Sequence, residues 1–145
     1  MTPVELFAAT QTDRVFRLPA IHLAEALAKR GQPAYHYIFT WESPLMSGRL
    51  GACHARELGF LFGVYEETFS GSGPDAAALS SNFQDAWTTF ARTGNPTCAG
   101  LGEWPVYGER RVTMLLDKEC ALSEAPFEAK RLAWEGIPGD AAGPL

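Results

Sequence analysis

Cysteine is scarce in this sequence, and its spacing excludes two common uses of the residue. Cys53, Cys98 and Cys120 lie far apart, and no C-x-x-C pair occurs. Zinc knuckles and disulfide frameworks need closely spaced or paired cysteines. We therefore expect reduced thiols. We also expect neither a metal nor a cofactor.

Positive charge is also limited. The 145 residues include 12 Lys and Arg against 17 Asp and Glu, with a formal net charge of -5 and a pI near 5.1. Proteins that bind nucleic acid need basic side chains to neutralise phosphates. Nucleic acid is therefore not an expected partner.

Long apolar runs are absent as well. A bilayer-spanning helix needs about 20 mainly apolar residues, and no run of that length occurs. The amino terminus lacks the basic and then apolar segments of an export signal. The sequence predicts a protein that is cytoplasmic or otherwise soluble, without a membrane partner. The location of a longer protein stays open.

The sequence does contain enough apolar side chain for one folded domain. Hydrophobic residues make up 46% of the chain and aromatic residues 12%, and the length suits a single domain. We expect residues 1–135 to form the folded segment. The tail, residues 136–145, has little to pack and is expected to be disordered.

Helical periodicity predicts a first helix over residues 15–30. Asp13 is placed to cap it, Pro19 to kink or delay it, and Gly31 to end it. Its apolar stripe consists of Phe16, Ala20, Leu23, Ala24 and Leu27.

Further helices are expected downstream. The clearest begins at Pro74 and ends at Gly94. A shorter helix is expected over residues 126–135. The run LGFLFG, residues 58–63, indicates either a helical turn or an extended buried segment. The apolar stripe of the clearest helix consists of Leu79, Phe83, Ala86, Trp87 and Phe90.

Two strands are predicted, at Tyr35–Phe39 and Val112–Leu116, and the long helical connection between them suits a parallel pair. His36, within the first strand, is interpreted as a structural residue. A strand pair by itself is marginally stable, and its outer edges need neighbours. The fold class is therefore α/β, as part of a sheet whose other strands lie elsewhere.

One histidine lies in a loop of small residues. His54 occurs in GACHARELGFLFG and could be a core residue, a metal ligand or the acid/base of an active site; local spacing does not choose among these. The neighbouring Cys53 is a poor nucleophile candidate, because a Cys-His pair needs side chains that converge from separate segments.

Several motifs together resemble a known family. Over residues 12–134 the chain is similar to the carboxy-terminal part of a type B carboxylesterase, in the para-nitrobenzyl esterase and cholinesterase branch of the α/β-hydrolases. The resemblance implies the C-terminal portion of an α/β-hydrolase fold, with few sheet strands and packed helices, incomplete as an isolated chain. The motifs, in order, are TDRVFRLPA, AYHYIFTW, GACHARELGFLFG, FQDAWTTFARTGNP and EWPVYG.

The resemblance also implies roles for two residues of the G-x-x-H-x-x-E-L pattern. His54 matches the triad's general base, which takes the serine proton and returns it to the leaving alcohol. Glu57 matches a supporting residue that orders the loop, since the family's triad acid comes from an earlier loop. Gly59 stands where the family usually has proline, a departure that loosens the local turn.

The nucleophile of that chemistry is not in the sequence. No G-x-S-x-G elbow or glycine-rich oxyanion loop occurs, and Ser70 and Ser72 lack glycines at the required offsets. We therefore expect a C-terminal fragment of a serine carboxylic ester hydrolase, inactive alone. Its partner would be the N-terminal part, and its substrate a small carboxylic ester. The alternative is a non-catalytic module that self-associates or binds partners through its open sheet edge.

Overall fold

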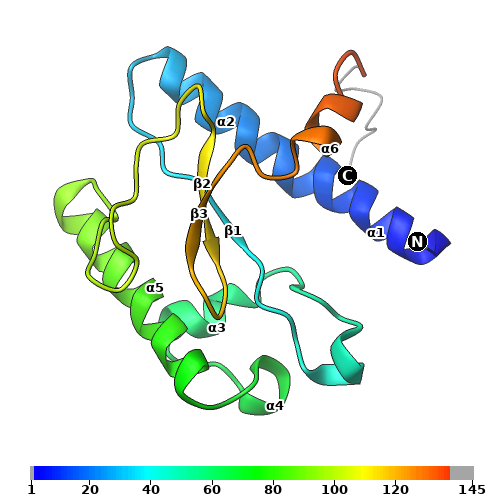
Figure 1. Ribbon diagram of the computed structural model, residues 1–145, viewed down its shortest axis with the longest axis vertical. Coiled ribbons are helices and arrows are strands. Elements are labelled where there is room, and N and C mark those ends of the chain that lie inside the picture. Colours follow the sequence, from blue (N-terminus) through cyan, green and yellow to red (C-terminus); the bar gives the residue numbers. More distant parts are fainter. Residues whose placement is uncertain (1, 138–145) are drawn as a thin grey trace.

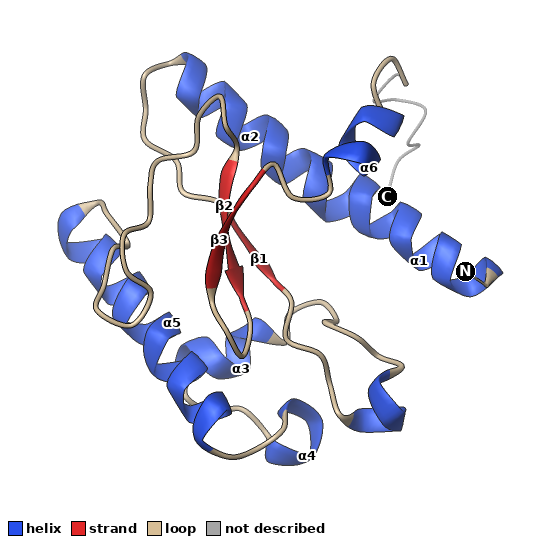
Figure 2. Ribbon diagram, viewed as in Figure 1, coloured by secondary structure: helices blue, strands red, loops and turns tan. Residues whose placement is uncertain are grey.

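A three-stranded sheet lies at the centre of the structure, a computed structural model that describes residues 2–137 (Figure 1). The strand order is β1-β2-β3. β1 (Tyr37–Phe39) runs parallel to β2 (Val112–Leu116), and β3 (Ala121–Glu124) runs antiparallel to β2. Helices lie on both sides of the sheet (Figure 2). The predicted α/β class and the parallel pair are confirmed.

The edge strands differ from the prediction. β3 was missed, because three of its four residues are exposed and give no alternating pattern; pairing with β2 alone makes it a strand. β1 is shorter than predicted. Before it, the His36 carbonyl still accepts from the Met114 amide of β2 at 3.0 Å, whereas the Ala34 carbonyl accepts from the Tyr107 amide at 2.7 Å.

A continuous helical rod covers one side of the sheet. It consists of α1 (Pro3–Thr12), the π-helical segment η1 (Asp13–Arg17) and α2 (Leu18–Lys29). The prediction that Asp13 caps the helix is wrong. The capping residue is Thr2, which forms a capping box with Glu5. Asp13 is instead buried within the rod, where it pairs with Arg17.

Pro19 neither starts nor ends the rod. A proline cannot donate to the carbonyl four residues earlier. The turn before Pro19 is wider than an α-turn, with the Leu18 amide bonded to the Asp13 carbonyl.

The buried face of the rod also differs from the predicted stripe. Ile21 and Ala24 are buried, whereas Leu23 is 64% exposed.

The main core lies on the other side of the sheet. There α5 (Pro74–Thr93) and α3 (Glu57–Phe62) pack together and against β2. α5 has the predicted bounds and ends at Gly94 in the left-handed conformation. Of the run 58–63, residues 58–62 are helical and belong to α3, and Gly63 follows as its left-handed C-cap. Phe90 of the predicted stripe is half-exposed, and the buried cluster consists of Phe60, Ala76, Leu79, Phe83, Ala86, Trp104, Met114 and Leu116.

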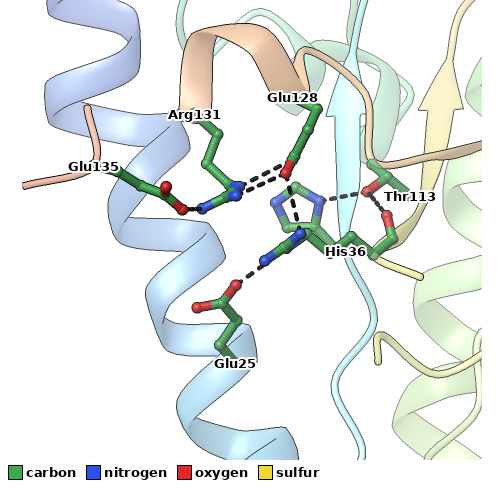
Figure 3. Close-up of polar contacts among 7 residues, drawn as sticks. Glu25, His36, Thr113, Glu128, Arg131 and Glu135 are labelled. Carbon is green, nitrogen blue, oxygen red and sulfur yellow. Dashed lines mark hydrogen bonds and ion pairs between the residues drawn. The ribbon is translucent and has the colours of Figure 1, made fainter. Parts of the chain in front are cut away.

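The carboxy-terminal helix is held by charged side chains. α6 (Glu128–Ala133) is shorter than the predicted 126–135. Arg111, immediately before β2, bonds Glu25 of α2 at 3.2 Å and Glu128 of α6 at 3.3 Å (Figure 3). Of the expected disordered tail, residues 138–145 lie outside the described part. Among the helices described, none has the length and apolarity needed to cross a bilayer.

Candidate active site

The loop that carries His54 follows β1 and leads into α3. It contains a 3-10 turn, η2 (Leu45–Gly48), and a short helix, α4 (Glu67–Ser70), lies beyond α3. Ser43 anchors the loop, since its hydroxyl donates to the Phe69 carbonyl at 2.7 Å and its amide donates to the Gly51 carbonyl at 3.0 Å. His54 thus stands on the carboxyl side of a parallel strand, where α/β folds place ligand sites.

A buried arginine also holds this loop. Arg56 is 3% exposed, and its Nη1 donates to the carbonyl oxygens of Trp41 at 3.2 Å and Gly51 at 3.4 Å. Its guanidinium lies over the Phe69 ring, 5.1 Å from the ring centre. Sequence reasoning missed Arg56. The sequence shows that Arg56 lies in the histidine motif. Its burial, however, depends on a contact with Trp41, 15 residues earlier in the chain.

The His54 ring is exposed to solvent and stacks on an aromatic ring of the rod. The Phe16 and His54 ring centres are 4.6 Å apart, with 28° between the ring planes. Within the described residues, no group hydrogen-bonds to the imidazole. Both edges of the ring are therefore free for a reaction partner.

His54 borders a groove of about 770 Å³. Its walls are the rod, the segment 34–39 and the loop 50–57. Consecutive strand residues point to opposite faces of a sheet, so a groove lined by all of 34–39 runs along the outer edge of β1. That edge has no strand partner among the described residues.

Glu57 lines the same groove, on the first turn of α3. The described residues contain no hydrogen bond between its carboxylate and the His54 ring. The negative charge of Glu57 also affects Tyr37. Burial raises the pKa of the Tyr37 phenol most, and the Glu57 charge raises it further. Cys53 also lines the groove, but Ser70 and Ser72 do not. Within residues 2–137, no group of three possible metal ligands converges.

His36 is a different kind of histidine. It is buried, and the Thr113 hydroxyl that it meets at 3.0 Å donates its own proton to the Arg111 carbonyl (Figure 3). His36 must then be the donor, so its proton is on Nδ1. Burial, and to a lesser extent the Arg17 charge, lower the pKa of His36. A buried neutral imidazole with a fixed tautomer fits the structural role predicted from sequence.

Known proteins are similar to this chain in sequence. A model of the carboxylesterase family matches residues 2–133. The chain is 36% identical over 125 residues to the para-nitrobenzyl esterase of Bacillus subtilis, an alignment that covers 83% of this chain and 25% of the relative. It is 33% identical over 112 residues to the phenmedipham hydrolase of Pseudarthrobacter oxydans, covering 73% of this chain and 22% of the relative.

Solved structures of carboxylesterases also match the fold of this chain. A para-nitrobenzyl esterase structure superposes with a TM-score of 0.78 at 33% identity, over 91% of this chain and 27% of that one. The carboxylesterase EST55 of Geobacillus stearothermophilus gives 0.77 at 32%, over 89% and 27%. The described fold is thus part of an α/β-hydrolase, and the chain spans about a quarter of the length of these relatives. The chain belongs to the carboxylesterase family.

Proposed function

We propose that this chain supplies the general base, His54, to a serine carboxylic ester hydrolase. The nucleophilic serine, the oxyanion donors and the triad acid come from protein outside these 145 residues. The observation that carries the proposal is the solvent-exposed His54 ring beside the β1 groove, in a loop anchored by Ser43 and Arg56.

Ester hydrolysis by this mechanism requires His54 to transfer a proton twice in each half-reaction: once as a base and once as an acid. The neutral imidazole accepts the serine proton as the serine oxygen attacks the ester carbonyl, and the imidazolium then donates that proton to the departing alcohol. A water molecule, activated in the same way, releases the acid. Glu57 has a supporting role, because its carboxylate shares the groove without bonding the His54 ring.

The groove along β1 is where the rest of the enzyme would dock. An open strand edge offers unpaired amides and carbonyls to another strand. Exposed apolar side chains line the same groove, among them Phe16, Leu23 and Leu50. A companion segment that pairs with β1 would cover these side chains and bring its serine toward His54.

The test uses hydrolysis of a short-chain nitrophenyl ester. The chain is assayed alone and after fusion to the amino-terminal three quarters of the Bacillus subtilis para-nitrobenzyl esterase. We expect no turnover above background alone, turnover in the fusion, and a loss of roughly 10⁴-fold or more in kcat with His54→Ala. His22→Ala, at an exposed position of α2, is the matched control. A fusion that is active and indifferent to His54→Ala would refute the proposal.

The alternative is a non-catalytic module that self-associates through the open β1 edge. The observation that favours it is the exposed apolar lining of that edge. Sedimentation velocity of the chain alone decides this point. A concentration-dependent dimer that Leu23→Asp disrupts supports self-association, and a monomer at high micromolar concentration excludes it.

A further inference from the structure

We propose that Phe16 is a positioning residue for His54, a role that rests on the function proposed above. The two rings stack with centres 4.6 Å apart and planes 28° from parallel. The residues come from different elements, since Phe16 lies in η1 and His54 precedes α3. The contact therefore joins the helical rod to the loop that carries the base.

Stacking is a contact suited to a general base. The nitrogen atoms of imidazole donate and accept in the plane of the ring. A partner on the ring face restricts rotation of the side chain while both nitrogen edges stay free. A hydrogen-bonding partner in the same position would occupy one of the two nitrogens that the reaction uses.

The rod has a local feature that determines where Phe16 points. Residues Asp13–Arg17 form a π-helical turn, which contains one residue more than an α-turn. One residue turns an α-helix by about 100°, so a regular helix would present position 16 in another direction. Wide turns of this kind occur frequently at functional sites.

Neighbouring contacts hold that turn in place. Asp13 is buried and pairs with Arg17, at the two ends of the π-helical segment. Arg17 in turn lies over the Phe127 ring, 4.4 Å from its centre. These contacts therefore support the segment that carries Phe16, although the residue itself is 47% exposed.

Core packing does not account for Phe16. A half-exposed phenylalanine contributes less burial than the core rings of α5, and it lines the groove with Leu23. Leu23 is more exposed, and its aliphatic side chain has no ring to stack on His54. Comparing the two positions separates stacking from the general apolar character of the groove.

The first measurement needs no activity. In proton NMR of the 145-residue chain, the carbon-bound imidazole protons of His54, assigned with His54→Ala, are expected upfield because they lie over the Phe16 ring. Phe16→Leu should move them toward the values of exposed His22. Phe16→Tyr should keep them shifted, and Leu23→Ala should leave them unchanged. Signals of buried His36 report that each variant is folded.

The second measurement uses the fused esterase. We expect Phe16→Leu to lower kcat by about 10- to 100-fold with little change in KM, because misplacing a catalytic group by about 1 Å costs up to that much. Phe16→Tyr should restore kcat, and Phe7→Leu, at an exposed position of α1 outside the groove, should have no such effect. If Phe16→Leu does not fold, Phe16→Met removes the ring while keeping a long apolar side chain.

The outcomes separate this inference from the proposed function. Unshifted His54 signals in the unaltered chain, or an unchanged kcat in Phe16→Leu, overturn the role of Phe16 even where His54→Ala abolishes activity. An equal loss of kcat in Phe7→Leu also overturns it. Full activity in His54→Ala overturns the proposed function, and with it the catalytic purpose of the stacking.

Discussion

Arg56 Nη1 donates to the Trp41 carbonyl at 3.2 Å, and this contact joins the beginning of the loop after β1 to the residue two positions beyond His54. The same nitrogen donates to the Gly51 carbonyl. Nε and Nη2 are buried without a partner among the described residues. A buried cation thus holds three points of one loop together.

Replacing Arg56 should loosen that loop. We expect Arg56→Ala to lower the free energy of unfolding by about 2 kcal/mol, since two carbonyls lose a charged donor and Phe69 loses its contact. Urea denaturation measures the change. Arg92→Ala, at an exposed position of α5, is the control and should change stability by no more than about 0.5 kcal/mol.

Stability should depend on pH through His36. Its pKa is lowered in the folded state, by burial and by Arg17, so the unfolded chain binds more protons once the pH falls toward the ordinary histidine value of about 6.5. The free energy of unfolding should therefore decrease as pH falls below that value, down to the folded pKa. Arg17, Arg111 and Glu128 line the small cavity beside the ring.

Urea denaturation at pH 7 and pH 5.5 tests this. His36→Asn keeps a donor for Thr113 but cannot titrate, so its stability should fall less with acid than that of the unaltered chain. His22→Asn, the same substitution at an exposed position of α2, is the matched control. An equal acid response in His36→Asn and the unaltered chain would contradict the assignment.

Gly59 allows a close approach within the histidine motif. A Cβ at this position would lie 3.1 Å from the Tyr65 Cα. Because that neighbour is backbone, Gly59→Ala should displace the segment after α3 and destabilise the protein by about 1–3 kcal/mol. Gly108→Ala is the matched control, since a Cβ there meets nothing within 4 Å. Thermal unfolding should separate the two variants.

The core between α5 and the sheet should be sensitive to truncation. Phe83 is 0% exposed and contacts the rings of Tyr37, Phe39 and Trp87. Phe83→Ala should cost about 3–5 kcal/mol. Phe7→Ala, on an exposed position of α1, loses a side chain of the same size and should cost little. Similar losses in both variants would place the core elsewhere.

Local sequence was sufficient for the regular elements that bury one face. α5 follows from Pro74, its apolar repeat and Gly94, and β2 follows from its run of apolar and β-branched residues. The start of the rod could also have been predicted, because Thr2, Pro3 and Glu5 form a capping-box pattern. Asp13 was assigned as the cap instead. His54 and Glu57 were predicted as site residues because their motif occurs among others in the order typical of the family.

Tertiary structure alone decided the rest. β3 is a strand because β2 offers it hydrogen bonds, and its own exposed residues carry no signal. Arg56 is buried because carbonyls from the other end of its loop fold over it. Phe16 meets His54, 38 positions later in the sequence, because a π-helical turn and the path of β1 bring two elements together. Periodicity and capping are local properties of a chain, whereas these contacts depend on long-range pairing that no short window of sequence contains.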